Sequence, residues 1–135
     1  MPLLVDTGVL FALADASDAW HRKTRAFLAA SHETLLVPVT VLPEVAYLLH
    51  ARIGPDAERA FVRAIAEREL AVEEIHARDW RRIEEVLEAY NAIGMVDASI
   101  VAVAERLRLS TLATTDRRHF AAIRPRHVER FTLVP

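Results

Sequence analysis

The chain has 135 residues, of which 53% are hydrophobic and 27% are charged, with a formal net charge of −2 and no cysteine. These values are typical of a folded protein with one domain over residues 1–135, give no overall basic field for nucleic acid, and exclude disulfides and thiolate metal sites. No apolar run approaches the roughly 20 residues of a membrane span, and the absence of cysteine is compatible with a cytoplasmic protein.

The first half of the chain predicts two strands that are each followed by helices. An uninterrupted apolar run at 3–5 predicts a strand buried on both faces, and it ends at Asp6 just before a helical pattern. Ser17 is a candidate N-cap for the next helix, whose inward residues are expected to be Trp20, Ala26, Phe27 and Ala30. The elements expected in this half are strands at 3–5 and 34–39 and helices at 9–13, 18–30 and 40–53.

The second half continues the alternation of helices and strands. Trp80 and Tyr90 follow the spacing of an apolar helical stripe, so we expect both to pack in the core. The run 114–116 extends the next-to-last strand and ends on Asp116. The elements expected here are helices at 57–68, 76–90 and 95–107 and strands at 70–75, 110–113 and 131–134. This alternation predicts an α/β fold with a parallel sheet covered by helices on both faces.

Four acids are placed where they can meet at one edge of that sheet. Asp6 and Asp116 follow strands, while Glu44 and Asp97 lie in the first turns of helices. Ligands bind at the carboxyl edge of open α/β sheets. Three of these placements are also explained by helix capping, but Glu44 and Asp97 are expected on apolar faces, where a solvated cap would not lie.

A cluster of four carboxylates requires a cation. Two unit charges about 4 Å apart repel by about 4 kcal/mol at an effective dielectric constant of 20. Lys23 is the only lysine, and arginines are not interleaved with the four acids. A hard divalent ion with oxygen ligands, Mg²⁺ or Mn²⁺, is the natural counter-charge, whereas the six histidines show no spacing typical of zinc ligands.

Four motifs in order along the chain resemble those of PIN-domain ribonucleases, and the size of the chain resembles that of the VapC toxins of type II toxin–antitoxin systems. The motifs are Leu4-Val5-Asp6-Thr7, Pro43-Glu44-Val45-Ala46-Tyr47-Leu48-Leu49, Met95-Val96-Asp97-Ala98 and Thr114-Thr115-Asp116-Arg117-Arg118-His119-Phe120. One departure is Gly8, where the family more often has Asn.

The resemblance implies a three-layer α/β/α PIN-like fold with a central, mainly parallel sheet. It implies an endoribonuclease that hydrolyses phosphodiester bonds of single-stranded RNA with Mg²⁺ or Mn²⁺. Its catalytic and metal-binding residues would be Asp6, Glu44, Asp97 and Asp116, with Thr114 and Thr7 orienting the carboxylates. It further implies a homodimer and a cognate antitoxin, whereas the short apolar runs predict no membrane association. The helices at 40–53 and 57–68 are candidate binding elements for the antitoxin, with packing on the core alone as the alternative.

Several other functions remain to be weighed against this one. A haloacid-dehalogenase-like phosphatase would require a second Asp at the position of Gly8, and a receiver domain would require a lysine after a late strand. The remaining alternatives are a non-toxin PIN nuclease in RNA processing and a non-catalytic PIN-like module that binds RNA or protein. The second of these usually lacks one or more acids, and all four are present here.

Overall fold

Five parallel strands form the central sheet of the computed structural model, which describes all 135 residues. The strand order is β3-β2-β1-β4-β5, so β1 lies in the middle and its three residues are fully enclosed. This position explains the uninterrupted apolar run at the start of the chain. The strands are β1 (Leu3–Val5), β2 (Leu35–Pro38), β3 (Leu70–Glu73), β4 (Thr111–Ala113) and β5 (Thr132–Val134).

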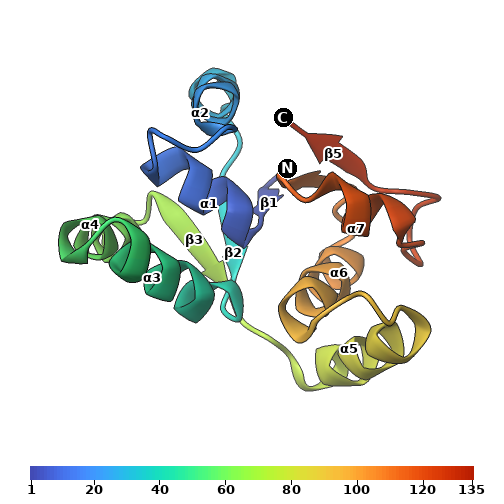
Figure 1. Cartoon of the computed structure of the whole chain (residues 1–135). Coiled ribbons are helices and arrows are strands. Elements are labelled where there is room, and N and C mark those ends of the chain that lie inside the picture. The colour runs from blue at the N-terminus through green and yellow to red at the C-terminus, as the bar shows by residue number, and fades with distance from the viewer.

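Helices cover both sides of the sheet, as Figure 1 shows, with α1 to α4 on one side and α5 and α6 on the other. α7 lies beside β5. The helices are α1 (Thr7–Ala14), α2 (His21–Ala30), α3 (Val41–Arg52), α4 (Pro55–Ala66), α5 (Ala77–Ala89), α6 (Met95–Leu107) and α7 (Arg117–Ala122). The predicted three-layer α/β/α architecture is therefore confirmed, and its sheet is parallel throughout. None of the helices combines the length and apolar character needed to cross a membrane.

The order of the strands fixes where a site can form. The chain passes from β1 outward through β2 to β3 and then returns, by way of α5 and α6, to place β4 against the free side of β1. The strand order therefore reverses between β1 and β4. In open α/β sheets, the crevice at the carboxyl ends of two such strands is the usual ligand site.

Two predictions about α2 are wrong. Ser17 does not cap the helix, because its amide and hydroxyl both hydrogen-bond to the carboxylate of Asp15, and α2 begins only at His21. Thr24 is the fully buried residue of α2, whereas Ala26 and Ala30 are exposed. The alanine side chain is too small to decide which face of a helix is buried. The prediction based on Ala26 and Ala30 therefore chose the wrong face of α2.

The expected burial of Trp80 is also wrong, because 47% of its surface is exposed. The inward position next to it is taken by Asp79, which is 2% exposed and pairs with Arg106 of α6. Tyr90 packs against the core as expected, and its hydroxyl accepts a hydrogen bond from the amide of Arg124. The buried ion pair between α5 and α6 thus occupies the inward position that the apolar stripe had assigned to Trp80.

Candidate active site

Two of the four predicted acids begin helices at the carboxyl edge of the sheet. Asp6 follows β1 directly and caps α1, since its Oδ1 accepts a hydrogen bond of 3.1 Å from the amide of Val9. Asp116 lies three residues beyond the end of β4 and caps α7 through a 3.2 Å bond from the amide of His119. Each acid therefore stabilises a helix N-terminus at the crevice where the strand order reverses.

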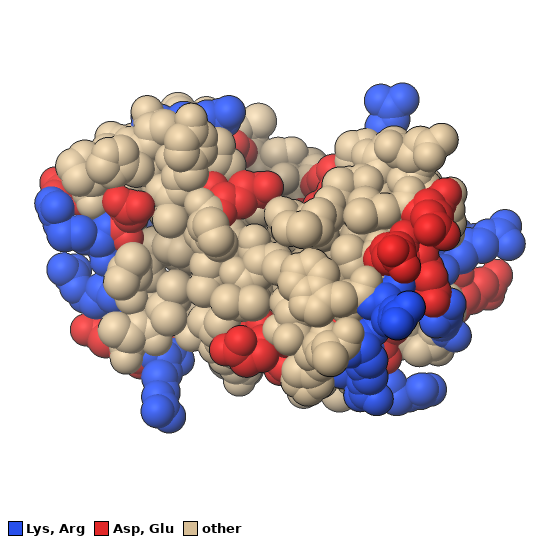
Figure 2. Space-filling model, turned by 90° about the horizontal axis from the view of Figure 1, so that it is seen from below, with Lys and Arg blue, Asp and Glu red and all other residues tan.

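All four predicted acids line one cavity of about 420 Å³ at this crevice. Glu44 reaches it from the first turn of α3, and Asp97 reaches it from the first turn of α6. Figure 2 looks onto this edge of the sheet and shows acidic side chains around a hollow, with Lys and Arg toward the periphery of the view. The lining consists of Asp6, Thr7, Gly8, Glu44, Gly94, Met95, Val96, Asp97, Thr115 and Asp116.

The cavity opposes ionisation of two of its acids. Burial raises the pKa of Asp6 to about 6, with further increases from the charges of Asp97 and Asp116, despite hydrogen bonds from Thr114 and Val9 that lower it. Burial likewise raises the pKa of Asp97 to about 6, helped by the charges of Asp116 and Glu44. Carboxylates in this condition are stabilised by a proton or by a bound cation.

Thr114 links the two strand-end acids. Its hydroxyl donates to Oδ2 of Asp6 and accepts a hydrogen bond of 2.9 Å from the amide of Asp116. Thr114 is fully buried, so these bonds are shielded from water. Thr7 also lines the cavity, but its buried hydroxyl oxygen has no hydrogen-bond partner. That hydroxyl is therefore free to bond to a ligand of the cavity.

The reason for including Glu44 proves wrong, although the side chain does line the cavity. Glu44 was expected at the edge of the apolar arc of its helix with its carboxylate pointing along the buried surface, and it does lie beside that arc, but it is exposed at the cavity wall. α3 buries Val41, Val45 and Leu49, which lie four residues apart, and Glu44 falls beside that line rather than on it. Its charge is thus solvated and needs no partner to offset burial.

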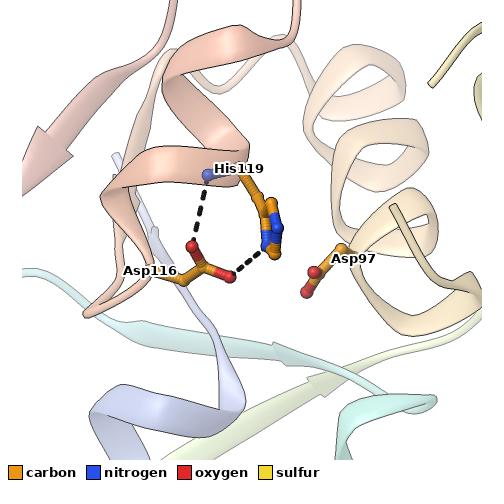
Figure 3. Close-up of side chains that lie close together, drawn as sticks. All are labelled: Asp97, Asp116 and His119. Carbon is orange, nitrogen blue, oxygen red and sulfur yellow. Dashed lines mark hydrogen bonds and ion pairs between the residues drawn. The ribbon is translucent and has the colours of Figure 1, made fainter. Parts of the chain in front are cut away.

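His119 is a polar neighbour of the cavity that the sequence analysis missed. One ligand atom each from Asp97, Asp116 and His119 lies within 4.8 Å of the others. The imidazole Nδ1 is 2.7 Å from Oδ2 of Asp116 and lies between the two carboxylates, as Figure 3 shows. The available signal was the three-residue spacing from Asp116 to His119, which places both at the start of one helix. It was overlooked because histidines were compared only with one another.

Gly8 and Thr115 form a close contact at the cavity wall. A Cβ atom added at Gly8 would lie 2.2 Å from the hydroxyl oxygen of Thr115 and 3.6 Å from Oδ1 of Asp6. The absence of a side chain at position 8 therefore leaves room for the Thr115 hydroxyl beside Asp6.

Comparisons with known proteins agree on one family. The PIN domain family model matches residues 3–124. Ribonuclease VapC26 of Mycobacterium tuberculosis (strain ATCC 25618 / H37Rv) is 34% identical over 135 residues, covering 98% of this chain and 100% of the relative.

Solved structures agree in fold. The crystal structure of Mycobacterium tuberculosis VapC20, described as a Sarcin-Ricin loop cleaving toxin, superposes with a TM-score of 0.75 and 26% identity over 82% of this chain and 86% of that one. A toxin–antitoxin complex from Klebsiella pneumoniae superposes with a TM-score of 0.73 and 21% identity over 98% of this chain and 96% of that one.

Proposed function

This chain belongs to the PIN-domain family, and within it to the VapC ribonucleases, and we propose that it is a metal-dependent endoribonuclease acting as the toxin of a type II toxin–antitoxin pair. The observation that carries the proposal is the convergence of Asp6, Glu44, Asp97 and Asp116 on one cavity. The proposed substrate is single-stranded RNA, and the proposed location is the cytoplasm.

The residues of the cavity fit a hard divalent cation, Mg²⁺ or Mn²⁺. The donors are carboxylate oxygens, and Thr7 adds a buried hydroxyl oxygen that has no partner within the protein. Burial, with the charges of neighbouring acids, raises the pKa values of Asp6 and Asp97, so a bound cation would favour their ionised forms. Oxygen donors and an excess of negative charge are what Mg²⁺ and Mn²⁺ sites require.

We assign separate tasks to the residues. Asp6 and Asp97 would hold the ion, and Glu44 and Asp116 would complete the site directly or through water. Thr114 keeps the carboxylate of Asp6 in place by donating to Oδ2. A bound ion of this kind supplies water activation and neutralises charge on the leaving oxygen during in-line hydrolysis of a phosphodiester. The half-exposed rim around Asp116 leaves one side of the cavity open to a strand of RNA.

The test is cleavage of an end-labelled single-stranded RNA with the purified protein. We expect cleavage with Mg²⁺ or Mn²⁺, none in excess chelator, and none by an Asp97→Asn variant purified in the same way. An Asp15→Asn variant, changed at the end of α1 outside the acidic cavity, should cleave like the wild type. Undiminished cleavage by Asp97→Asn or in chelator would refute the proposal.

We further propose that a cognate antitoxin binds the groove between α1, α3 and α4. This groove of about 370 Å³ is almost wholly apolar, with Leu10, Leu49 and Phe61 among its lining residues. α1 and α3 both begin at the acidic cavity and continue into the groove. An apolar antitoxin segment lying along them could place an arginine against the carboxylates, which would compete with the metal.

Two substitutions on α4 test this proposal. Ala60 lines the groove, whereas Val62 is 54% exposed and does not. Co-expression with the cognate antitoxin should suppress the RNA cleavage of the wild type and of Val62→Glu, but not that of Ala60→Glu. Equal suppression of both variants would exclude the groove as the binding site.

A homodimer is proposed on the basis of an exposed apolar surface on α5 and at the start of α6. Trp80, Leu87 and Met95 are 47%, 36% and 48% exposed and line one shallow pocket. We expect a dimer mass by light scattering for the wild type and a monomer mass for Leu87→Glu. A wild-type monomer at concentrations of tens of micromolar would contradict the proposal.

A further inference from the structure

We propose that His119 supplies a nitrogen ligand to the acidic cavity and thereby makes the site favour first-row transition ions such as Mn²⁺ over Mg²⁺. The inference rests on the proposed function, because it concerns the ion held by the same cavity. Figure 3 shows its basis, in which the imidazole lies between the carboxylates of Asp116 and Asp97.

The spacing of the three residues suits one ion. A ligand atom from each lies within 4.8 Å of the other two. Bonds of about 2.1 Å in an octahedral site place adjacent donors about 3 Å apart and opposite donors about 4.2 Å apart. Closing the set therefore requires donor movements of roughly 1 Å. The side chain of His119 can move because it is 39% exposed, and that of Asp97 can move because no hydrogen bond holds its carboxylate.

Asp116 orients the imidazole. Its Oδ1 accepts from the backbone amide of His119, and its Oδ2 lies 2.7 Å from Nδ1 of the same residue. In the metal-free protein a proton lies between Nδ1 and Oδ2, and a bound ion would take the place of that proton with Nδ1 and Oδ2 as adjacent donors. The 2.7 Å between Nδ1 and Oδ2 is close to the roughly 3 Å between adjacent donors of an octahedral ion, so both atoms can bind one ion once that proton has left.

The imidazole nitrogen of His119 decides whether the site prefers Mn²⁺ or Mg²⁺. Mg²⁺ binds oxygen and keeps much of its water, so an imidazole nitrogen adds little to its affinity. First-row transition ions accept imidazole, with affinities that rise from Mn²⁺ onward along the series. A site of carboxylates alone would discriminate less between Mn²⁺ and Mg²⁺ than a site with one nitrogen.

The first experiment measures metal binding by the whole protein. Calorimetric titrations with Mn²⁺ and Mg²⁺ are compared among the wild type, His119→Gln and His32→Gln. Glutamine retains a side chain that can hydrogen-bond to Asp116 but has no imidazole, and His32 is an exposed control between α2 and β2. We expect the ratio of Mn²⁺ to Mg²⁺ affinity to fall about tenfold in His119→Gln alone. An unchanged ratio would overturn the inference.

The second experiment needs no variant. Pulsed electron paramagnetic resonance of the wild type with bound Mn²⁺ should show nitrogen coupling, and ¹⁵N labelling of histidine should change it. Bound Mn²⁺ that supports RNA cleavage but shows no nitrogen coupling would refute only the role of His119. Cleavage that persists without any metal would instead refute the proposed function, and with it this inference.

Discussion

Neutralising Asp97 should stabilise the metal-free protein even as it abolishes activity. The side chain lies in a cavity with three other acids, and no hydrogen bond holds its carboxylate. Replacing the acid with Asn removes a charge that burial and the neighbouring acids disfavour, with only His119 opposing them, and leaves a side chain of nearly the same volume. The expected result is a higher melting temperature for Asp97→Asn than for the wild type in chelator at pH 7.5.

The pKa of Asp97 sets the magnitude and the sign of the expected change in folding stability. It is raised from 3.8 to about 6, and two pKa units correspond to about 3 kcal/mol. Because Asp97 is partly exposed, solvent screening reduces this to about 2 kcal/mol. The folded state binds the proton more tightly than the unfolded state does. The stability that protonated Asp97 contributes to the folded state is therefore fully present below pH 3.8 and is lost as the pH rises through 6.

Thermal unfolding in chelator at several pH values is the assay. About 2 kcal/mol corresponds to roughly 6–10 °C for a chain of this length, and this gain should be present at pH 7.5 and vanish near pH 4. Asp15→Asn is the matched control, because hydrogen bonds from Ser17 lower the pKa of Asp15, so it should gain nothing. Adding Mn²⁺ should raise the melting temperature of the wild type and leave Asp97→Asn nearly unchanged.

A melting temperature of Asp97→Asn at or below that of the wild type, at pH 7.5 in chelator, would refute the reasoning. It would mean that Asp97 supports the fold as an ordinary residue of a helix N-terminus. A gain that was the same at pH 4 and pH 7.5 would refute it as well, because removal of a charge cannot act where the carboxyl is already neutral.

Three further substitutions test contacts around the site. Gly8→Ala should cost about 1–3 kcal/mol in urea unfolding, because its Cβ would overlap the hydroxyl of Thr115, and most of this loss should disappear with Thr115→Ala as the second change. Arg106→Leu should cost about 3–5 kcal/mol by thermal unfolding, because it leaves the buried carboxylate of Asp79 unpaired, and a loss below 1 kcal/mol would count against that pair. Thr114→Val should lower stability by about 2 kcal/mol and reduce RNA cleavage, whereas Thr114→Ser should retain both, since only Val lacks the hydroxyl that bonds to the carboxylate after β1.

The sheet and the acids at its edge could be predicted because their signals are local. A strand enclosed on both faces requires an uninterrupted apolar run, and the run at 3–5 has no other use in a soluble fold. Parallel pairing then brings the ends of β1 and β4 together, so Asp6 and Asp116 meet although they are 110 residues apart. No knowledge of side-chain packing was needed for that step.

The errors at Trp80 and His119 occurred where a long-range polar contact or a short helix decides the local structure, whereas those in α2 came from small alanines and a local Ser17–Asp15 contact. The burial of Asp79 in place of Trp80 depends on Arg106, which lies on another helix and gives no signal near residue 80. His119 depends on α7, whose six residues are too few to show a helical pattern. Periodicity therefore identified the faces that pack through apolar contacts and failed for those that pack through charges.

Capping and metal binding had been weighed as competing roles for the strand-end acids, yet capping occupies only Oδ1 of each carboxylate. In Asp6, Oδ1 accepts from the amide of Val9 and Oδ2 from the hydroxyl of Thr114. In Asp116, Oδ1 accepts from the amide of His119 and Oδ2 faces the imidazole. Each carboxylate is thus held in a fixed orientation, and its remaining lone pairs stay available to the cavity.

Glu44 and Asp97 differ from this pair, because no hydrogen bond restrains either side chain. In the metal-free protein, we expect mutual repulsion to be relieved by movement of these two carboxylates, while hydrogen bonds hold Asp6 and Asp116 in place. Closure of the site around an ion then requires reorientation mainly of Glu44 and Asp97. The two helix caps hold one half of the site ready before the metal arrives, and this is the reason why capping supports the proposed catalytic role rather than arguing against it.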